Sequence, residues 1–190
     1  LRIAITPTAL LFGRDMIGKR VEYEVLQFCQ FDGDVIVKQH SQADTGSIMA
    51  QAEGHAPEKR QYTQIGNTSQ SPDDACTLIR QLIEAAVSGD YAAFDDHPAL
   101  KSRIAWFDEQ HAGHSQVSFS FPLQFSDGEW VATRADWQEI ARGERFGVDA
   151  TGKELEYESL MIHRVVDGSV VDVRSFADIL VMRQQLGIQV

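Results

Sequence analysis

Two segments of this 190-residue chain repeat one another, and the repeat restricts the possible folds more than any other sequence feature. Residues 12–24 read FGRDMIGKRVEYE and residues 146–158 read FGVDATGKELEYE, at an offset of 134 residues. The match continues without a gap to Gln51 and Gln185, with 14 of 40 aligned positions identical. A period this long indicates a duplicated domain and not a solenoid. We call residues 12–51 and 146–185 the first and second repeat segments.

The repeat also predicts the domain organisation. Residues 72–190 are long enough for one complete domain, whereas residues 1–51 hold only the C-terminal strands of a partial first copy. We expect that the front half of this copy is missing from the chain; the alternative is a genuine short copy that serves as extra sheet. Residues 52–71 are polar, contain Gly, Pro and Ser, and predict a linker.

Composition excludes several classes of protein. The formal net charge is −11 at pH 7, which argues against a nucleic-acid or membrane-surface partner, because both normally meet a basic face. No apolar run reaches about 18 residues, the length that a membrane-spanning helix needs. The two cysteines, Cys29 and Cys76, do not make a disulfide framework. We therefore expect a protein of a reducing compartment, the cytoplasm.

Helices are predicted at the front of the second domain. Ser71-Pro72 is typical of a helix start, and Gly89 is expected to end that helix. The apolar spacing between them has the helical period. Shorter helices are predicted over residues 90–94 and 100–111.

Strands follow. Alternation predicts strands at 117–125, with Pro122 at an edge or a bulge, and at 129–134. Residues 135–145 are predicted to be a loop or a short helix. Long strands at 155–166 and 169–176 are joined by a hairpin turn at Asp167-Gly168, and Asp178 opens the last helix. This order predicts an α+β fold, with the helices packed on one face of a curved antiparallel sheet.

The hairpin also predicts which side chains share a face. A two-residue loop at 167–168 pairs residues whose numbers sum to 335, and side chains alternate between faces. One face then mixes apolar and polar side chains: Tyr157, Met161, His163, Val165, Val170, Asp172, Arg174 and Asp178. Such a mixture is typical of an enclosed pocket for a small molecule.

Four motifs in order resemble the SnoaL-like polyketide cyclase family of the nuclear-transport-factor-2-like superfamily. They are GEWVATR at 128–134, FGVDATGK at 146–153, HRVVDGSVV at 163–171 before Asp178, and QLG at 185–187. The resemblance covers residues 73–190, and residues 12–51 a second time. It implies a cone-shaped α+β barrel in which helices close a strongly bent sheet around a pocket.

The resemblance also implies site residues. An aspartate near the C-terminus acts as general acid/base in such cyclases, and a histidine on the preceding strand polarises the carbonyl; the matching positions are Asp178 and His163. The face predicted above adds Tyr157, Met161, Asp172 and Arg174 as substrate-binding candidates. Two of these depart from the family pattern: Arg174 takes the place of a tryptophan and Met161 that of a polar residue. The alternative for Asp178 is a simple role as the helix N-cap. The alternative for Arg174 is an ion pair with Asp172 or Asp178.

The resemblance implies chemistry without a cofactor or a metal. His111 and His114 have a spacing that a metal could use, but no cysteine or carboxylate cluster joins them in the sequence. We expect a small hydrophobic molecule as the ligand and a cyclase, isomerase or lyase reaction. A hydrolase on the same scaffold and a non-catalytic binding or dimerisation module remain as alternatives. A homodimer, or a pseudo-dimer that packs sheet against sheet, is the expected assembly.

Overall fold

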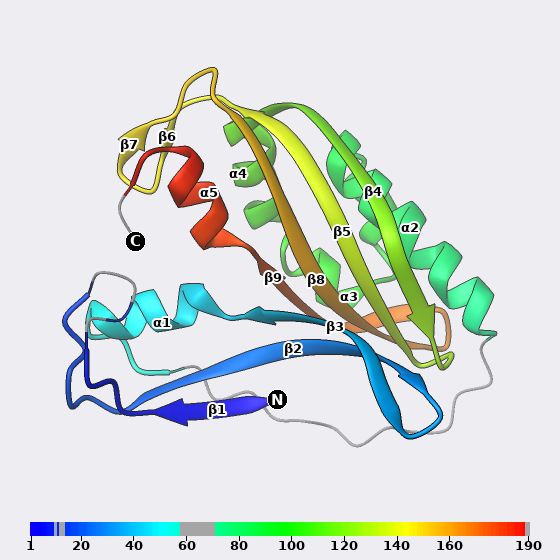
Figure 1. Cartoon of the computed structure of the whole chain (residues 1–190). Coiled ribbons are helices and arrows are strands. Elements are labelled where there is room, and N and C mark those ends of the chain that lie inside the picture. The colour runs from blue at the N-terminus through cyan, green and yellow to red at the C-terminus, as the bar shows by residue number, and fades with distance from the viewer. Residues whose placement is uncertain (10, 12–13, 58–70, 189–190) are drawn as a thin grey trace. The chain divides into compact units, whose positions relative to one another are not determined.

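The computed structural model describes all residues except 10, 12–13, 58–70 and 189–190. The chain divides into two compact units (Figure 1). Unit 1 comprises Leu1–Thr63 and Phe176–Val190, and unit 2 comprises Gln64–Ser175. Among the described residues, no helix is both long enough and apolar enough to cross a membrane.

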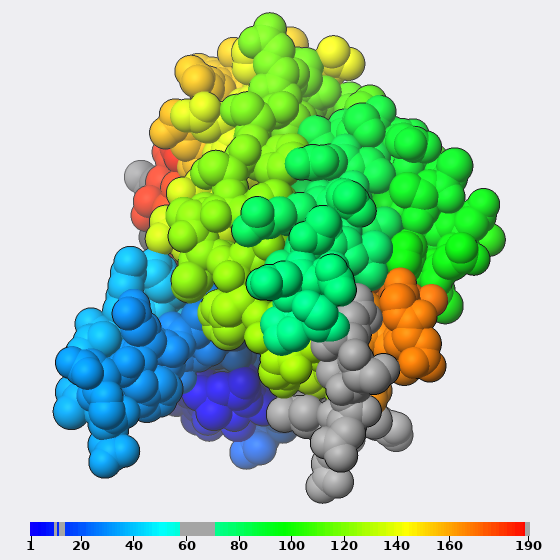
Figure 2. Space-filling model, turned by 90° about the vertical axis from the view of Figure 1, so that its right-hand side faces the viewer, coloured from blue at the N-terminus to red at the C-terminus, as the bar shows by residue number. Residues whose placement is uncertain are grey.

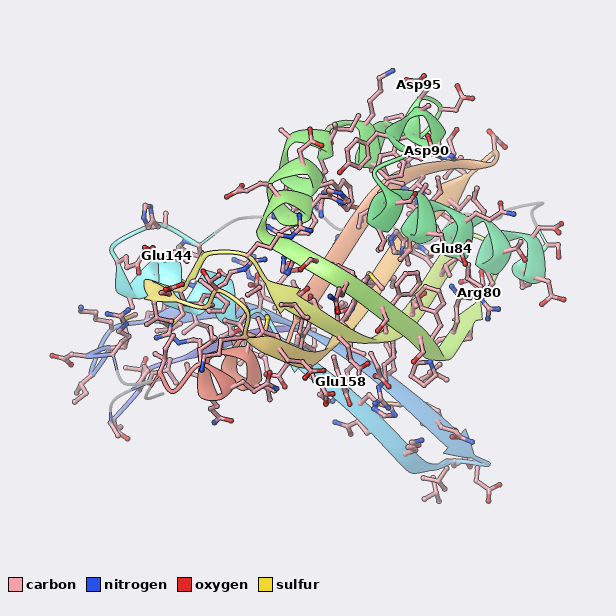
Figure 3. The ribbon with its side chains drawn as sticks, turned by 90° about the horizontal axis from the view of Figure 1, so that it is seen from above. Arg80, Glu84, Asp90, Asp95, Glu144 and Glu158 are labelled. Atoms are coloured by element: carbon pink, nitrogen blue, oxygen red, sulfur yellow. The ribbon has the colours of Figure 1, made fainter. Side chains whose placement is uncertain are left out.

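Unit 2 begins with helices. They are α2 (Pro72–Ser88), the 3-10 helix η1 (Tyr91–Phe94), α3 (Pro98–Lys101) and α4 (Ile104–Gly113). The predicted boundaries of α2 are correct: Ser71 is its N-cap residue, and Gly89 ends it in the left-handed conformation with φ 77°. Arg80 and Glu84 project from its exposed side (Figure 3).

The prediction of one continuous helix over residues 100–111 is wrong. The chain breaks it after Lys101 and starts α4 at Ile104. At the break, Nη2 of Arg103 donates a hydrogen bond of 2.9 Å to the Val173 carbonyl oxygen on the sheet. A local sequence pattern does not contain this long-range contact.

The sheet of unit 2 has the strand order β4-β5-β8-β9. The strands are β4 (His114–Ser126), β5 (Trp130–Ala141), β8 (Glu154–Val166) and β9 (Ser169–Ala177), whose last residues belong to unit 1. A short hairpin, β6 (Glu144–Arg145) with β7 (Val148–Asp149), lies between β5 and β8. Pro122 lies as predicted, on an edge strand and where the β4–β5 register shifts between Ser120 and Leu123.

Residues 135–145 were predicted as a loop or short helix, and this is wrong. β5 continues to Ala141 and pairs with β8 from Trp130, opposite Arg164, to Ile140, opposite Glu154. The turn at 167–168 is confirmed, because Asp167 and Gly168 have φ of 49° and 76°, as a two-residue I′ turn requires.

The helices of unit 2 cover one face of this sheet, which we call the inner face (Figure 1). Phe94 and Ile79, both 0% exposed, form the core between helices and sheet together with Val131, Val165 and Val170. The outer surfaces of the helices and of β4 are seen in Figure 2. The predicted α+β fold, with helices on one face of an antiparallel sheet, is confirmed.

The described residues of unit 1 form a three-stranded sheet and two helices. The elements are β1 (Arg2–Ile5), β2 (Val21–Asp32), β3 (Val35–Ala43), α1 (Thr45–Ala52) and α5 (Ile179–Gln185), with strand order β1-β2-β3. The prediction that residues 1–51 contain only strands is therefore wrong, because the helix α1 follows the strands and reaches Ala52. Most of the predicted linker, residues 58–70, lies outside the described residues.

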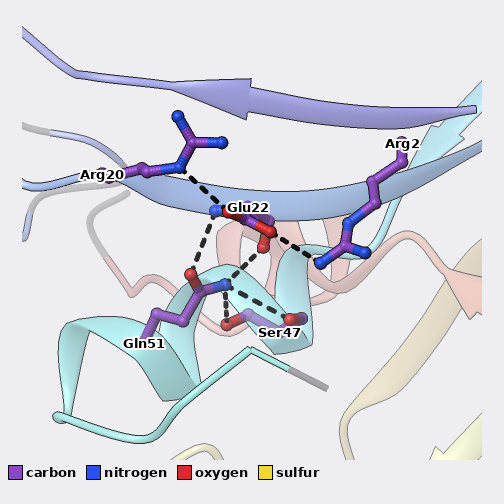
Figure 4. Close-up of polar contacts among 5 residues, drawn as sticks. All are labelled: Arg2, Arg20, Glu22, Ser47 and Gln51. Carbon is purple, nitrogen blue, oxygen red and sulfur yellow. Dashed lines mark hydrogen bonds and ion pairs between the residues drawn. The ribbon is translucent and has the colours of Figure 1, made fainter. Parts of the chain in front are cut away.

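Gln51 attaches α1 to β2 (Figure 4). Its Oε1 accepts from the Glu22 backbone N–H at 3.0 Å, and its Nε2 donates to the Glu22 carbonyl oxygen at 2.6 Å. The side-chain carboxylate of Glu22 pairs with Arg2 and Arg20 at 2.6 and 2.9 Å. The amide of Gln51 thus bonds to β2 as a neighbouring strand would.

The repeat segments have matching elements. Adding 134 to the bounds of β2 gives 155–166, which matches β8 to within one residue. Adding 134 to the bounds of β3 gives 169–177, which are the bounds of β9. The pairing register matches as well, since Ile3 lies opposite Tyr23 and Trp137 lies opposite Tyr157. A common origin of the two segments stays a prediction.

Candidate functional site

The strand register brings the predicted site residues of β8 onto the inner face. Met161 pairs with Thr133 and His163 with Val131, and paired residues point to the same side of a sheet. Met161, Val131 and Val165 all belong to the core beneath the helices. The inner face of unit 2 is therefore the candidate site.

His163 is buried on this face, with 4% of its surface exposed. Burial, together with the nearby positive charge of Arg103, lowers the pKa of His163 from 6.5 to about 4. The imidazole is therefore neutral at pH 7. Its Nδ1 has no hydrogen-bond partner among the described residues. A buried ring nitrogen of this kind is available to a polar atom of a ligand.

Arg174 lies beside Asp172, which is one of the two ion-pair partners expected from the sequence. Nη2 of Arg174 lies 3.4 Å from Oδ2 of Asp172. The arginine is buried and the aspartate is half-buried. Both stay candidates for contact with a substrate.

Met161 packs into the apolar core and is 6% exposed. Its packing explains why an apolar residue occupies this position. Contact between Met161 and a substrate remains a prediction.

Tyr157 lies at the other end of the inner face. It precedes His163 by six residues, which is roughly 20 Å along a strand. Its hydroxyl donates a hydrogen bond of 3.0 Å to Oε2 of Glu139. Burial and the negative charge of Glu139 raise the pKa of Tyr157 above its ordinary value, so the phenol keeps its proton. A small molecule is too short to reach both Tyr157 and His163.

Asp178 belongs to unit 1 and is the N-cap residue of α5. Its Oδ1 accepts from the Val181 backbone N–H at 3.1 Å. The capping role considered from the sequence is present. A catalytic role for Asp178 remains a prediction.

Sequence reasoning missed Glu139, Arg103 and Arg145. Glu139 is 4% exposed and lies on the inner face beside Trp137 and Tyr157, in the segment that was predicted as a loop or short helix. The alternation of Ala135 and Trp137 with polar neighbours was the available signal for a strand there, and Glu139 interrupts it. His114, which was considered only as a metal ligand, contacts Glu139 through Nδ1. No three His, Cys, Asp or Glu side chains of the described residues are grouped so that they could hold a metal ion.

Solved structures share this fold. TsrD from Streptomyces laurentii is 17% identical with a TM-score of 0.55, over 63% of this chain and 98% of that chain. IdmH from Streptomyces antibioticus, named as a candidate polyketide cyclase, is 23% identical with a TM-score of 0.53, over 59% and 97%. AclR from Streptomyces galilaeus, named as a candidate hydroxylase, is 17% identical with a TM-score of 0.54, over 62% and 98%.

A search of the curated proteins gave no match. The SnoaL-like polyketide cyclase family matches residues 73–186, which is more than half of the chain. This segment contains all of the helices and strands of unit 2 apart from the first residue of α2, and α5 of unit 1. The chain belongs to the SnoaL-like polyketide cyclase family.

Proposed function

We propose that this protein is a small-molecule enzyme that performs acid–base chemistry, such as an aldol-type cyclisation, on a hydrophobic carbonyl compound. The observation that carries the proposal is His163, a neutral buried imidazole whose Nδ1 has no partner among the described residues. In its Nδ1–H tautomer it donates a hydrogen bond to a carbonyl oxygen, which stabilises the negative charge of an enolate. Family membership and the description of IdmH as a candidate polyketide cyclase support the same reaction class.

The catalytic base in this proposal is Asp178, as the family resemblance implies. Its cap contact uses Oδ1. Asparagine caps a helix about as well as aspartate but cannot accept a proton from carbon. Asp178→Asn therefore separates the two roles, and Asp44→Asn is the matched control, because Asp44 caps α1 through Oδ1 in the same way.

Proton abstraction can be measured without knowledge of the natural substrate. We would follow hydrogen–deuterium exchange at the acidic C–H of 2-tetralone by NMR in D2O. The wild-type protein should accelerate exchange over buffer, and His163→Gln should reduce the rate. Asp178→Asn should reduce it while Asp44→Asn does not. Full activity in Asp178→Asn would remove Asp178 from the proposal.

A non-catalytic binding module is the second candidate. The core packing of Met161 and the cap contact of Asp178 favour it, because both residues already have structural roles. Binding of 2-tetralone without accelerated exchange would support this candidate and contradict the enzyme.

We also propose that the two repeat segments form an internal pseudo-dimer. Their equivalent ends touch within unit 1: Nε2 of Gln42 donates to the Ala177 carbonyl oxygen at 3.4 Å. A monomer in light scattering supports an internal pair, and a dimer supports the homodimer alternative.

A further inference from the structure

A buried polar network lies where α4 meets β4, and the proposed function does not use it. Its centre is Glu139, whose Oε2 accepts from the Tyr157 hydroxyl at 3.0 Å and whose Oε1 contacts Nδ1 of His114. Arg145 contacts both ring nitrogens of His114. The side chains of Glu139 and His114 are 3% and 9% exposed.

The partners of His114 determine its tautomer. A carboxylate only accepts hydrogen bonds and a guanidinium only donates them. The arrangement therefore fits the tautomer with its proton on Nδ1, which faces Glu139, and its lone pair on Nε2, which faces Arg145. Of the two oxygens of Glu139, Oε2 accepts the hydrogen bond from Tyr157, and Oε1 contacts Nδ1 of His114 without forming a regular hydrogen bond. The Tyr157 hydroxyl on one oxygen and the His114 ring against the other restrict the orientation of this carboxylate.

Aromatic side chains surround the carboxylate on the inner face. Trp137 stacks on Tyr157 with ring centroids 6.4 Å apart, and Phe119 packs on Trp137 at 5.3 Å. The indole N–H of Trp137 donates to the Ser159 hydroxyl at 2.8 Å, so this ring is also fixed in place. Flat apolar molecules pack against aromatic side chains of this kind, and Glu139 and Tyr157 are the polar groups beside them.

We propose that Glu139 is a catalytic base of unit 2 and that Tyr157 is the donor that stabilises the enolate, for aromatic ketones with an acidic C–H. The proposal rests on the proposed function in its substrate class, but it uses other residues. In the step, Oε2 of Glu139 takes the proton from carbon, and the electron pair of the C–H bond moves to the carbonyl oxygen. The Tyr157 hydroxyl, no longer bonded to a carboxylate, donates to the new enolate oxygen. The proton then returns to carbon.

A purely structural network is the competing explanation. It predicts lower stability in the variants but no specific change in proton transfer. The rate and its pH profile distinguish the two explanations, because a structural role would not move them in a folded variant.

The test is deuterium exchange into 2-tetralone by the full chain, measured against pH. Glu139→Gln should lower the rate about 100-fold and remove its rise with pH. Tyr157→Phe should lower it at least about tenfold, and Glu139→Asp should recover part of the rate. Gln138→Ala is the control, because Gln138 is the exposed neighbour of Glu139 and lies on the opposite face of the sheet.

Thermal unfolding establishes that each variant is folded. If Glu139→Gln does not fold, Tyr157→Phe, which lacks one hydroxyl, decides the test. A rate within twofold of wild type in either folded variant overturns the proposal. If the wild-type protein itself gives no exchange, the proposed function fails first; if His163→Gln alone lowers the rate, the proposed function stands and Glu139 is structural.

Discussion

The β1–β2–β3–α1 region and the β5–β8–β9–α5 region have the same order of elements and the same strand order at an offset of 134 residues, but different side chains at equivalent positions. Where the second region has Trp137, Glu139, Ser159, His163 and Arg174, the first has Ile3, Ile5, Val25, Cys29 and His40. The positions that keep their residue include Tyr23 and Tyr157, and the caps Asp44 and Asp178. The order of elements therefore does not depend on the polar set, and the candidate chemistry belongs to the second region.

The caps show how this comparison limits a functional assignment. Asp44 and Asp178 have nearly the same backbone angles, φ −72° and −76° with ψ 75° in both, and each accepts from the N–H three residues later. Asp44 is kept in a region where an isoleucine and a cysteine replace Glu139 and His163. Capping alone is therefore enough to account for an aspartate at this position.

The largest expected effect concerns the contacts of α1. Ile48 is 2% exposed and packs with Met16 and Val21, whereas its equivalent Met182 is 9% exposed. Ile48→Ala should lower the free energy of unfolding by about 3–4 kcal/mol, because it leaves a cavity. Met182→Ala should cost less, about 2 kcal/mol. Urea unfolding followed by far-UV circular dichroism measures both, and an equal or reversed order would contradict the difference in packing.

The second prediction concerns pH and compares His163 with Cys29. The pKa of His163 is about 4 in the folded chain and 6.5 in its ordinary state, so protons bind more tightly to the unfolded chain. The contribution of His163 to the free energy of unfolding is present above about pH 6.5. It is lost as the pH falls toward 4, which lowers the free energy of unfolding by about 3 kcal/mol in all. The measurement is the free energy of unfolding at intervals between pH 7 and pH 4.

His163→Cys, which installs the residue of the first region, should remove this slope whatever its effect on stability at pH 7. The buried His97, whose pKa is also lowered by burial, contributes with the same sign in both proteins and cancels in the difference. Parallel pH curves for wild type and variant would show that His163 is not the group that titrates.

The sequence predicted α2 and the 167–168 turn because each depends on local residues: a helical apolar period closed by Gly89, and an Asp-Gly pair with positive φ. The second half of β5 was not predicted, because the buried Glu139 interrupts its apolar alternation. Its partners Tyr157 and His114 come from other strands. The same long-range contacts that hid the strand make Glu139 a candidate, so the local pattern failed at the proposed site.

The third prediction tests the caps. Asp44→Ala and Asp178→Ala should each lower the free energy of unfolding by about 1 kcal/mol, because the N–H groups of Ser47 and Val181 lose their acceptor. Asparagine at either position should change it by a few tenths of that amount. Thermal or urea unfolding of the four variants checks this. A much larger loss at Asp178 than at Asp44 would show that the Asp178 carboxylate has a further structural contact.

The smallest expected effect has the opposite sign. Gly46 lies in the first turn of α1, where the second region has Leu180. A Cβ built at Gly46 would lie 3.6 Å from Oδ1 of Asp44 and 3.7 Å from Cδ1 of Ile179, which are ordinary contacts. Gly46→Ala should therefore raise the free energy of unfolding by about 0.5 kcal/mol, since alanine loses less backbone entropy on folding. Urea unfolding measures the gain, and a loss would show that α1 and α5 approach more closely than these distances indicate.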